Sequence, residues 1–260
     1  MHIGFIGTGT IATAIVSGLN TLDSATFTFL LSPRNAGVAA SLASAFDNVT
    51  VAASNQAVLD GCDNVVLAIR PQVASEVLGS LRFRPDHHVI SLMALLSIDR
   101  VQALVTPATG VVRAIPLPMV ATHAGVTVLY PDDPTARAIF NQLGSTITLE
   151  SPEHFNAFST ATATMAPYFA FADAITDWMI RQGVPPTTAR SYIAGMFHGL
   201  GTVAANPSAE TFPTLAAKFA TAGGINEQVL THLTQVGALK AVSDALDGVL
   251  SRMTEAKPSG

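Results

Sequence analysis

Small residues at a fixed spacing stand near the start of the chain, where a short apolar run passes into a helical pattern. Gly7, Gly9 and Ala12 follow the run from Ile3 to Ile6. The first glycine permits a tight turn, the second lets a pyrophosphate approach the backbone, and the small alanine lets the helix pack close to the strand. Free N–H groups at the helix start would face the phosphates. The pattern predicts dinucleotide binding, with an ordinary strand-to-helix turn as the alternative. The residues expected to bind the cofactor here are Gly7, Thr8, Gly9, Thr10, Ile11 and Ala12.

The segment that follows the second β-rich run indicates which dinucleotide would bind. Folds that bind NAD usually place Asp or Glu here to hold the ribose 2′-hydroxyl. This chain has Ser32-Pro33-Arg34-Asn35 instead, without a carboxylate. Ser32, Arg34 and Asn35 are donors that suit a 2′-phosphate, and the arginine adds an opposite charge. We therefore expect NADP (as NADPH) rather than NAD, unless Arg34 is a solvated turn residue.

Apolar runs and helical patterns alternate over the first 150 residues. This alternation predicts an α/β fold, an N-terminal Rossmann-type doubly wound parallel sheet. Expected strands are 2–7, 24–31, 49–51, 64–69, 88–92, 110–115, 125–130 and 145–149. Expected helices between them are 10–20, 36–46, 54–60, 73–81, 97–104 and 132–143.

The pattern changes near residue 150, because no β-rich run follows Pro152. Helices are expected over 152–172, 173–181, 187–206, 208–222 and 226–253, and residues 257–260 are expected to fray. The prediction is therefore two domains. Residues 1–150 are expected to form an NADP-binding Rossmann domain, and residues 151–260 are expected to form an all-helical domain.

The composition is unusually apolar. Hydrophobic residues make up 49% of the 260 residues, charged residues 12%, and the mean hydropathy is +0.42. No stretch is long and apolar enough for a membrane span. A helical domain buried against a second subunit therefore explains the high content of apolar residues better. We expect a homodimer or higher homo-oligomer through the helical domain, because helices such as 165–179 carry apolar residues on more than one face.

Charge and cysteine content exclude several classes of function. The net charge is −5 with a pI near 5.7 and no basic cluster, which argues against a nucleic-acid partner. The single cysteine, Cys62, excludes an internal disulfide and favours the cytoplasm. Because the first strand is expected to begin at residue 2, we expect no signal peptide. The expected partner is a small-molecule substrate. No spacing of ligating residues indicates a metal site. His198 is expected to be structural, and the alternative is a role as general acid for a ketone substrate.

Several segments together resemble one family. These are residues 3–9, 32–35, 65–72, 89–91, 112–116 and 125–130, with a weaker match as far as residue 250. In order and spacing the chain resembles the pyrroline-5-carboxylate reductase family. That resemblance implies an NAD(P)H-dependent imine reductase of proline biosynthesis, with a Rossmann domain and a helical domain through which subunits interlock. It places Ala68 and Arg70-Pro71-Gln72 beside the ribose and nicotinamide.

On the substrate side the sequence departs from the family pattern. Leu117 replaces an asparagine, and Ile225-Asn226 replaces two threonines that follow Gly223-Gly224. A cyclic iminium carries its own charge and needs positioning more than a strong acid. The candidate catalytic residues are Thr164, Thr221 and Asn226, and the candidate substrate-binding residues are Leu117, Thr162, Tyr168, Gly223 and Gly224.

Alternatives remain open at this point. A threonine in a helix often bonds its own backbone, and Gly223-Gly224 is also a plausible plain turn whose N–H groups could otherwise take a carboxylate. A related oxidoreductase acting on another imine, a ketone or a 2-oxo acid, or using a deazaflavin, is one alternative function. A non-catalytic NADP-binding dimer is the other.

Overall fold

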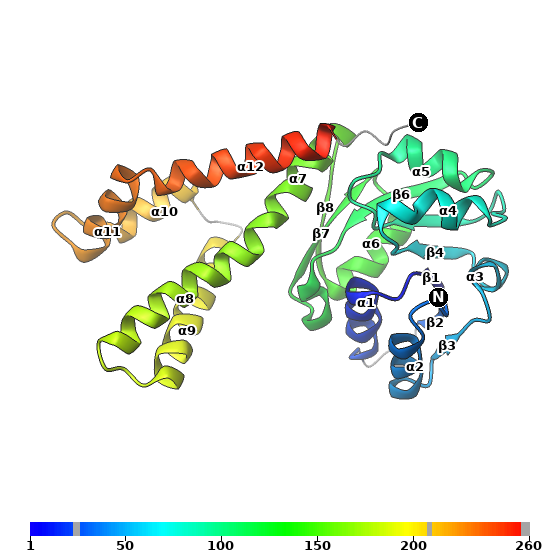
Figure 1. The fold of residues 1–260 in the computed structure, drawn as a ribbon, viewed down its shortest axis with the longest axis horizontal. Helices are drawn as coiled ribbons and strands as arrows, with labels where there is room; N and C mark the ends of the chain where they lie inside the picture. The colour runs from blue at the N-terminus through cyan, green and yellow to red at the C-terminus, as the bar shows by residue number, and fades with distance from the viewer. Residues whose placement is uncertain (23–26, 207–209, 256–260) are drawn as a thin grey trace. The chain divides into compact units, whose positions relative to one another are not determined.

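A computed structural model describes residues 1–22, 27–206 and 210–255. It divides into two compact units, residues 1–159 and 160–260. The first is built on an eight-stranded sheet of order β3-β2-β1-β4-β5-β6-β7-β8 (Figure 1). The strands are β1 His2–Ile6, β2 Thr28–Leu31, β3 Val49–Val51, β4 Asn64–Leu67, β5 His88–Ser91, β6 Gly110–Ile115, β7 Gly125–Tyr130 and β8 Gly144–Thr148. The predicted second strand began at residue 24, and residues 24–26 lie outside the described part.

Helices cover both faces of this sheet. They are α1 Thr10–Asn20, α2 Ala36–Ala45, α3 Asn55–Gly61, α4 Ala74–Gly79, α5 Ile98–Val105 and α6 Pro134–Phe140, with short 3₁₀ turns at η1 Pro71–Val73, η2 Pro118–Thr122 and η3 Asn141–Leu143. In Figure 1, α3, α4 and α5 lie on one face and α1 and α2 on the other. The predicted doubly wound fold is confirmed, with helices that end within a few residues of their expected limits.

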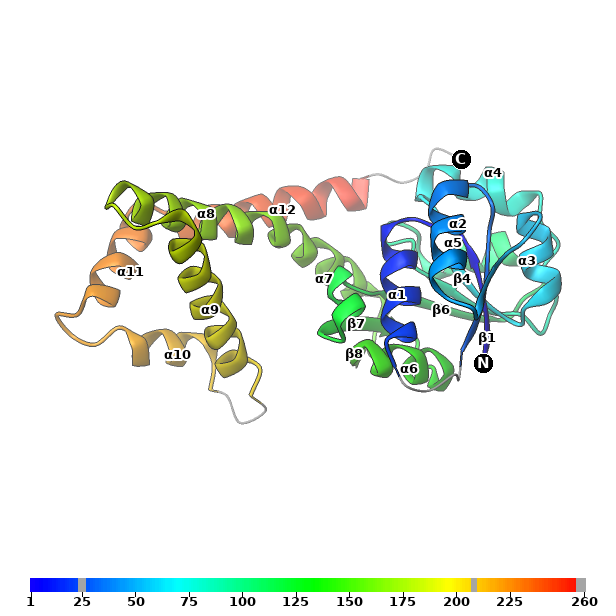
Figure 2. The ribbon, with the colours of Figure 1, turned by 90° about the horizontal axis from the view of Figure 1, so that it is seen from below.

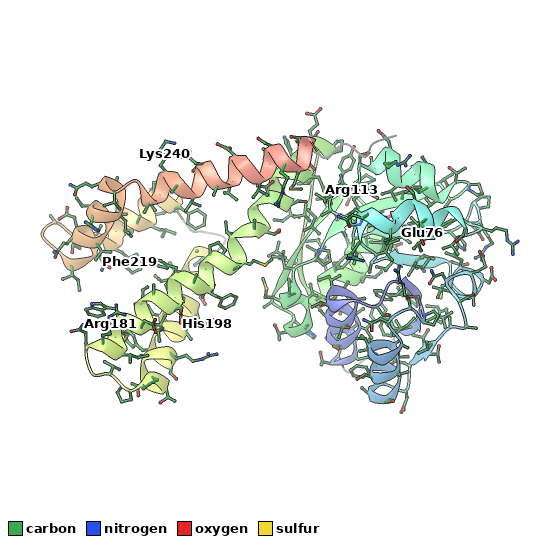
Figure 3. The ribbon with its side chains drawn as sticks, viewed as in Figure 1. Glu76, Arg113, Arg181, His198, Phe219 and Lys240 are labelled. Carbon is green, nitrogen blue, oxygen red and sulfur yellow. The ribbon has the colours of Figure 1, made fainter. Side chains whose placement is uncertain are left out.

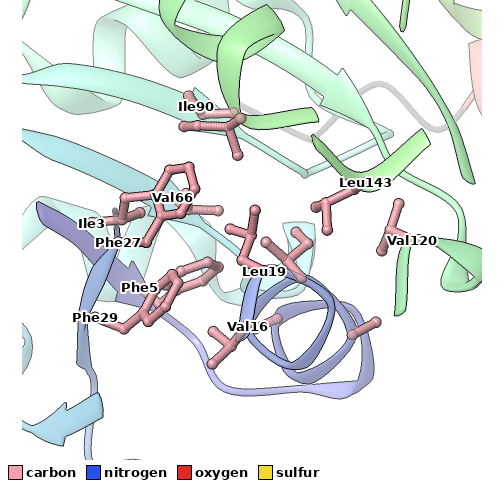
Figure 4. Close-up of a cluster of buried hydrophobic side chains, with 14 of the residues drawn as sticks. Ile3, Phe5, Val16, Leu19, Phe27, Phe29, Val66, Ile90, Val120 and Leu143 are labelled. Carbon is pink, nitrogen blue, oxygen red and sulfur yellow. The ribbon is translucent and has the colours of Figure 1, made fainter. Parts of the chain in front are cut away.

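Each face has its own apolar core. Phe5 and Phe29 of neighbouring strands point with Val66 toward Val16 and Leu19 of α1 (Figure 4). On the opposite face, alternate residues of the same strands pack against α3, α4 and α5. This alternation is the period-2 pattern of a strand buried on both sides. Because the central strands β1, β4 and β5 are buried on both faces, ligands can reach these strands at their ends.

Two strands, β7 and β8, run against the predicted direction. The prediction was a parallel sheet throughout, but β7 pairs antiparallel with β6, through Arg113–Tyr130 and Ile115–Val128, and β8 then runs parallel to β7. The physical reason is the short connection from residue 116 to residue 124, which holds only the 3₁₀ turn η2. A parallel return would need a longer crossover. The strands β3 to β6 keep the parallel order that positions the ligand edge.

The second unit is helical. Its elements, with those that lead into it, are η4 Pro152–His154, α7 Phe155–Ala161, η5 Thr162–Thr164, α8 Met165–Arg181, α9 Pro186–Ala204, α10 Phe212–Phe219, α11 Ile225–Gln235 and α12 Ala238–Glu255. Helix α9 returns beside α8 after Gly183 (Figure 2). Of the predicted helix 208–222, residues 208–209 lie outside the described part, as do residues 257–260.

Two predicted helix limits in this unit were wrong. The expected break between 172 and 173 is absent, because Asp173 lies within the continuous helix α8. The expected single helix 226–253 is divided at Gly237, whose φ of +73° ends α11 and starts α12. A left-handed φ is tolerated by glycine and stops a right-handed helix. Within the described ranges, no helix is long and apolar enough to cross a membrane.

Candidate functional site

The turn between β1 and α1 has the geometry that dinucleotide binding needs. Gly7 adopts φ +102°, and a Cβ built there would lie 2.5 Å from the Ala68 carbonyl oxygen. Only glycine fits that conformation and that contact. Gly9 is the N-cap of α1, and a Cβ built on it would meet no protein atom within 4 Å. Ala12 is fully buried between α1 and the sheet. The first glycine is therefore needed by the fold, whereas the second leaves open space.

The start of α1 is left without a protein cap. Gly9 provides no side chain, and the first turn of the helix, which includes Thr10 and Ile11, contains no acidic residue. Thr8 is 3% exposed, and its Oγ1 has no hydrogen-bond partner in the part of the chain that the structure describes. Unsatisfied N–H groups and the positive end of the helix dipole favour a bound anion. The residues present fit the pyrophosphate of a dinucleotide.

Two residues predicted to bind the 2′-phosphate also hold this turn. The Gly7 amide donates to Ser32 Oγ over 2.8 Å, and Asn35 Nδ2 donates to the Thr8 carbonyl over 3.1 Å. Ser32 is fully buried. Both side chains follow β2, which pairs with β1, so they reach the glycine turn directly. Both side chains therefore hold the glycine turn, and their contact with a phosphate stays a prediction.

We expect Ser32→Ala to lower the free energy of unfolding by about 1–3 kcal/mol, because the Gly7 amide would lose its acceptor in a part-buried turn. Urea unfolding measures this change. Ser41→Ala, at an exposed position of α2, is the matched control and should stay close to wild type. Equal stability of the two variants would show that the Ser32 hydroxyl does not hold the turn.

Arg34 remains as the basic group at the end of β2. Its side chain is exposed, and it stands just before α2. Asn35 is the N-cap of α2 but makes no side-chain cap, and the first turn of α2 has no acidic residue. A guanidinium beside an uncapped helix start suits a phosphate.

The end of β4 continues the same edge of the sheet. The Ala68 amide donates to the Ile6 carbonyl, which places Ala68 directly beside the glycine turn. Arg70 then adopts an extended conformation (φ −70°, ψ 140°) and precedes the 3₁₀ turn that Pro71 begins. Arg70 and Gln72 are exposed at this end. The two segments predicted to share the cofactor therefore do meet at the carboxyl ends of neighbouring strands, where such sheets bind ligands.

Two further strands end at this edge. Leu117 is half-buried just after β6 and is the N-cap of η2. Arg113 of β6 is buried, and its Nη2 donates to the Ala94 carbonyl in the turn after β5 (Figure 3). Arg113 lies within the segment 112–116 that resembles the family, but it was not among the predicted site residues. A charged residue inside an apolar strand was the signal that could have found it.

In the helical unit, the predicted residues around η5 are mostly engaged locally. Thr164 Oγ1 donates to the Ala161 carbonyl over 2.8 Å, so its proton is used by the backbone while its oxygen can still accept. Thr162 is half-buried. Tyr168 on α8 packs edge-on against Phe169 and against Phe197 of α9, with ring centroids 5.1 and 5.5 Å away.

The Gly223-Gly224 turn does start a helix, as predicted. Gly223 has φ +72°, the Gly224 amide donates to the Thr221 carbonyl, and Gly224 is the N-cap of α11. The Gly223 amide, however, donates to Glu227 Oε2 over 2.7 Å. The chain thus supplies its own carboxylate to a backbone donor that was predicted to take one from a ligand. Glu227 was not among the predicted site residues.

A shallow pocket of about 460 Å³ lies on this turn and on the adjoining flank of α11. Its lining is mostly polar and comprises Gly223, Gly224, Glu227, Gln228, Thr231, His232 and Gln235. Beside it, Ile225 is 81% exposed, and Asn226 is also exposed at the helix start. The pocket can hold a small polar ligand, with one carboxylate already within it.

Other chemistries find little support in the described residues. No group of three or more His, Cys, Asp or Glu in them could hold a metal ion. Cys62 is buried, and burial raises the pKa of its thiol to about 11, so it stays protonated near neutral pH and is a poor nucleophile. Dinucleotide binding is the chemistry best supported by the sheet unit.

Comparisons with family models match both units. Residues 2–95 match the model described as NADP oxidoreductase coenzyme F420-dependent, and residues 152–256 match the model described as pyrroline-5-carboxylate reductase dimerisation. Among curated proteins, the chain is 25% identical to pyrroline-5-carboxylate reductase 3 of Xenopus laevis, over 97% of this chain and 94% of that protein. It is 24% identical to pyrroline-5-carboxylate reductase of Haemophilus influenzae, over 97% of this chain and 96% of that protein.

Solved structures share the fold over nearly the whole chain. The 1-pyrroline-5-carboxylate reductase of Streptococcus pyogenes superposes with a TM-score of 0.85 at 24% identity, covering 98% of both chains. The pyrroline carboxylate reductase of Plasmodium falciparum with NADP bound gives a TM-score of 0.82 at 16% identity, covering 97% of both. A Streptomyces aurantiacus imine reductase gives a TM-score of 0.61 at 16% identity, covering 98% of this chain and 94% of that chain.

Proposed function

We propose that the chain belongs to the pyrroline-5-carboxylate reductase family and that it is an NADPH-dependent reductase acting on the C=N bond of a cyclic imine, in L-proline biosynthesis. The observation that carries the proposal is the cofactor edge of the sheet. There the Gly7 turn lies against Ala68, and the start of α1 has no side-chain cap. Beside it, the buried Thr8 hydroxyl has no hydrogen-bond partner among the described residues. These features fit a bound dinucleotide.

The chain's own residues would act mainly by positioning. NADPH, when bound, supplies the hydride. Gly7, Thr8 and Gly9 would hold its pyrophosphate, with Ser32 and Asn35 fixing the turn. Ala68 and residues 70–72 would border the ribose and nicotinamide. Thr164, Thr221 and Asn226 would orient the substrate, with Leu117, Thr162, Tyr168, Gly223 and Gly224 around it. An iminium needs no strong acid, which agrees with this set of mostly neutral groups.

The test is oxidation of NADPH by the purified protein when pyrroline-5-carboxylate is added. Consumption of NADPH with formation of proline supports the proposal. Absence of turnover over a range of pH, with NADPH still bound, would remove the proline assignment and leave the cofactor site intact.

We expect Arg34→Gln to raise the Kd for NADPH by about tenfold or more and to leave the Kd for NADH within about twofold. The exposed guanidinium stands beside the uncapped start of α2, where a 2′-phosphate would gain a charge-assisted hydrogen bond. Fluorescence titration with both cofactors measures the change. Arg82→Gln, at another exposed arginine, is the control and should alter neither Kd. An equal rise in the Kd for NADPH and in the Kd for NADH would contradict a role of Arg34 that is specific to the 2′-phosphate.

A homo-oligomer, with a dimer as its basic unit, completes the proposal. Large apolar side chains of the helical unit are exposed in the single chain, including Phe169, Trp178, Tyr192 and Phe212, at 69%, 56%, 62% and 75%. Exposed large apolar side chains of this kind are typical of a subunit interface. A match to a dimerisation model over residues 152–256 supports the same surface. We propose that the protein acts in the cytoplasm, where the buried Cys62 stays reduced.

A second candidate function is favoured by one observation. Glu227 already gives its carboxylate to the Gly223 amide, beside the residues proposed to bind substrate. Leu117 and Ile225 add apolar surface where a polar group was expected. An imine without a carboxylate would meet less repulsion at such a site than pyrroline-5-carboxylate would. Reduction of a carboxylate-free cyclic imine is therefore the alternative substrate assignment on the same cofactor site.

A further inference from the structure

Arg113 is a buried cation whose role the proposed reaction does not explain. Its side chain is 3% exposed, and its Nε is buried without an acceptor in the described ranges. Its guanidinium carbon lies 3.7 Å from the centroid of the Phe155 ring. Burial lowers the pKa of Arg113 to about 10, so the group stays charged near neutral pH. An unpaired buried charge is costly, and an apolar residue of similar size would often be tolerated as well or better.

The register of the sheet determines what Arg113 reaches. Arg113 lies directly beside Ser91, the last residue of β5, in the parallel pair β5–β6. Its Nη2 crosses the end of β5 and donates to the Ala94 carbonyl over 2.8 Å. Val111, two residues earlier on the same face of β6, is covered by the core beneath α5. At Arg113 the cover is Phe155 instead, which leaves room for a long planar side chain.

The turn that Arg113 holds is part of the ligand edge. The Leu92 amide donates to the Leu67 carbonyl, and the Ala68 amide donates to the Ile6 carbonyl. The ends of β1, β4 and β5 thus follow one another along a single edge. The adenosine half of a dinucleotide lies toward β2, because the residue after β2 contacts its ribose. The opposite half therefore extends toward β4 and the turn at residues 92–97.

We propose that Arg113 is a positioning residue for the nicotinamide half of the cofactor, acting through its hydrogen bond to the Ala94 carbonyl. The planar guanidinium donates across the end of β5 while its face stacks on Phe155. A lysine ammonium would not reproduce both contacts. Arg113 touches neither cofactor nor substrate in this arrangement. The inference rests on the proposed function, because it assumes that a dinucleotide occupies this edge.

The experiment compares two ligands on Arg113→Met in the full-length protein. NADPH reports on the whole site, whereas adenosine 2′,5′-bisphosphate reports on the adenosine half alone. We expect the Kd for NADPH to rise about tenfold and the Kd for adenosine 2′,5′-bisphosphate to change less than twofold. Amide hydrogen exchange at residues 94–96 should also become faster, because the turn loses its anchor. A purely structural arginine would affect both ligands equally.

Controls keep the result decisive. Wild-type binding of NADPH is measured first, and its absence would reject the proposed function rather than this inference. Arg137→Met, on α6, is the matched substitution and should leave both Kd values unchanged. If Arg113→Met does not fold, Arg113→Lys is tested with the same ligands and the same expected contrast. Equal Kd changes for the two ligands, or unchanged exchange at residues 94–96, would overturn the assignment.

Discussion

Gly9→Val is expected to raise the Kd for NADPH at least about 100-fold while the protein stays folded, which corresponds to about 2.7 kcal/mol of binding free energy. A Cβ at Gly9 meets no protein atom within 4 Å, and the backbone there (φ −94°, ψ −170°) suits any residue. The fold therefore does not need a glycine at this position. The pyrophosphate does, because it must approach the backbone at the start of α1. Fluorescence titration with NADPH, together with a thermal melt, measures both properties.

Two comparisons define this result. Gly79→Val is the matched control, because a Cβ there also meets open space and Gly79 lies on α4, away from the glycine turn. It should leave NADPH binding unchanged. Gly7→Val should instead destabilise the fold, since Gly7 has φ +102° and a new Cβ would collide with the Ala68 carbonyl. NADPH affinity retained in Gly9→Val would remove the pyrophosphate from this turn.

The cofactor edge of the sheet could be predicted from the sequence because the patterns that indicate it are local. The glycine spacing, the run before it and the missing carboxylate after the second strand all lie within short segments. The α/β fold is confirmed on that basis, and the family models that match residues 2–95 and 152–256 agree with the predicted family resemblance. The direction of β7 was not accessible from the strand pattern, because a strand has the same alternation whichever way it runs. Only the length of the preceding connection carried that information.

Roles that depend on contacts distant in sequence were harder to assign. Ser32 and Asn35 were predicted as phosphate donors from residue type, but each bonds a backbone group 25 or 27 residues earlier. Arg113 holds a carbonyl 19 residues earlier, through a register that the sequence does not show. Side-chain chemistry gives the ability to donate, whereas the strand pairing decides which acceptor is in reach. The proposed site residues themselves remain predictions until ligand binding is measured.

The role of Glu227 also depends on which partner the structure places within its reach, and this leads to a prediction about substrate choice. Glu227→Gln is expected to raise kcat/KM for pyrroline-5-carboxylate about tenfold relative to 1-pyrroline, the same ring without its carboxylate. In the wild type, Glu227 Oε2 accepts from the Gly223 amide over 2.7 Å and places a negative charge beside Asn226 and Thr221. A substrate carboxylate would meet that charge, whereas 1-pyrroline would not. Initial rates of NADPH oxidation with the two imines give the ratio directly.

The glutamine variant separates charge from shape. Its amide oxygen can still accept from the Gly223 amide, so the start of α11 should keep its structure and the thermal melt should change little. Asp247→Gln, on α12, removes one negative charge away from the turn and serves as the control for the overall charge of the protein. Raised ionic strength should narrow the difference between wild type and Glu227→Gln, because salt screens exposed charges. If Glu227→Gln leaves the ratio of the two kcat/KM values unchanged, the substrate carboxylate does not approach this turn. The proposed substrate roles of the turn residues would then be rejected together: Thr221, Gly223, Gly224 and Asn226.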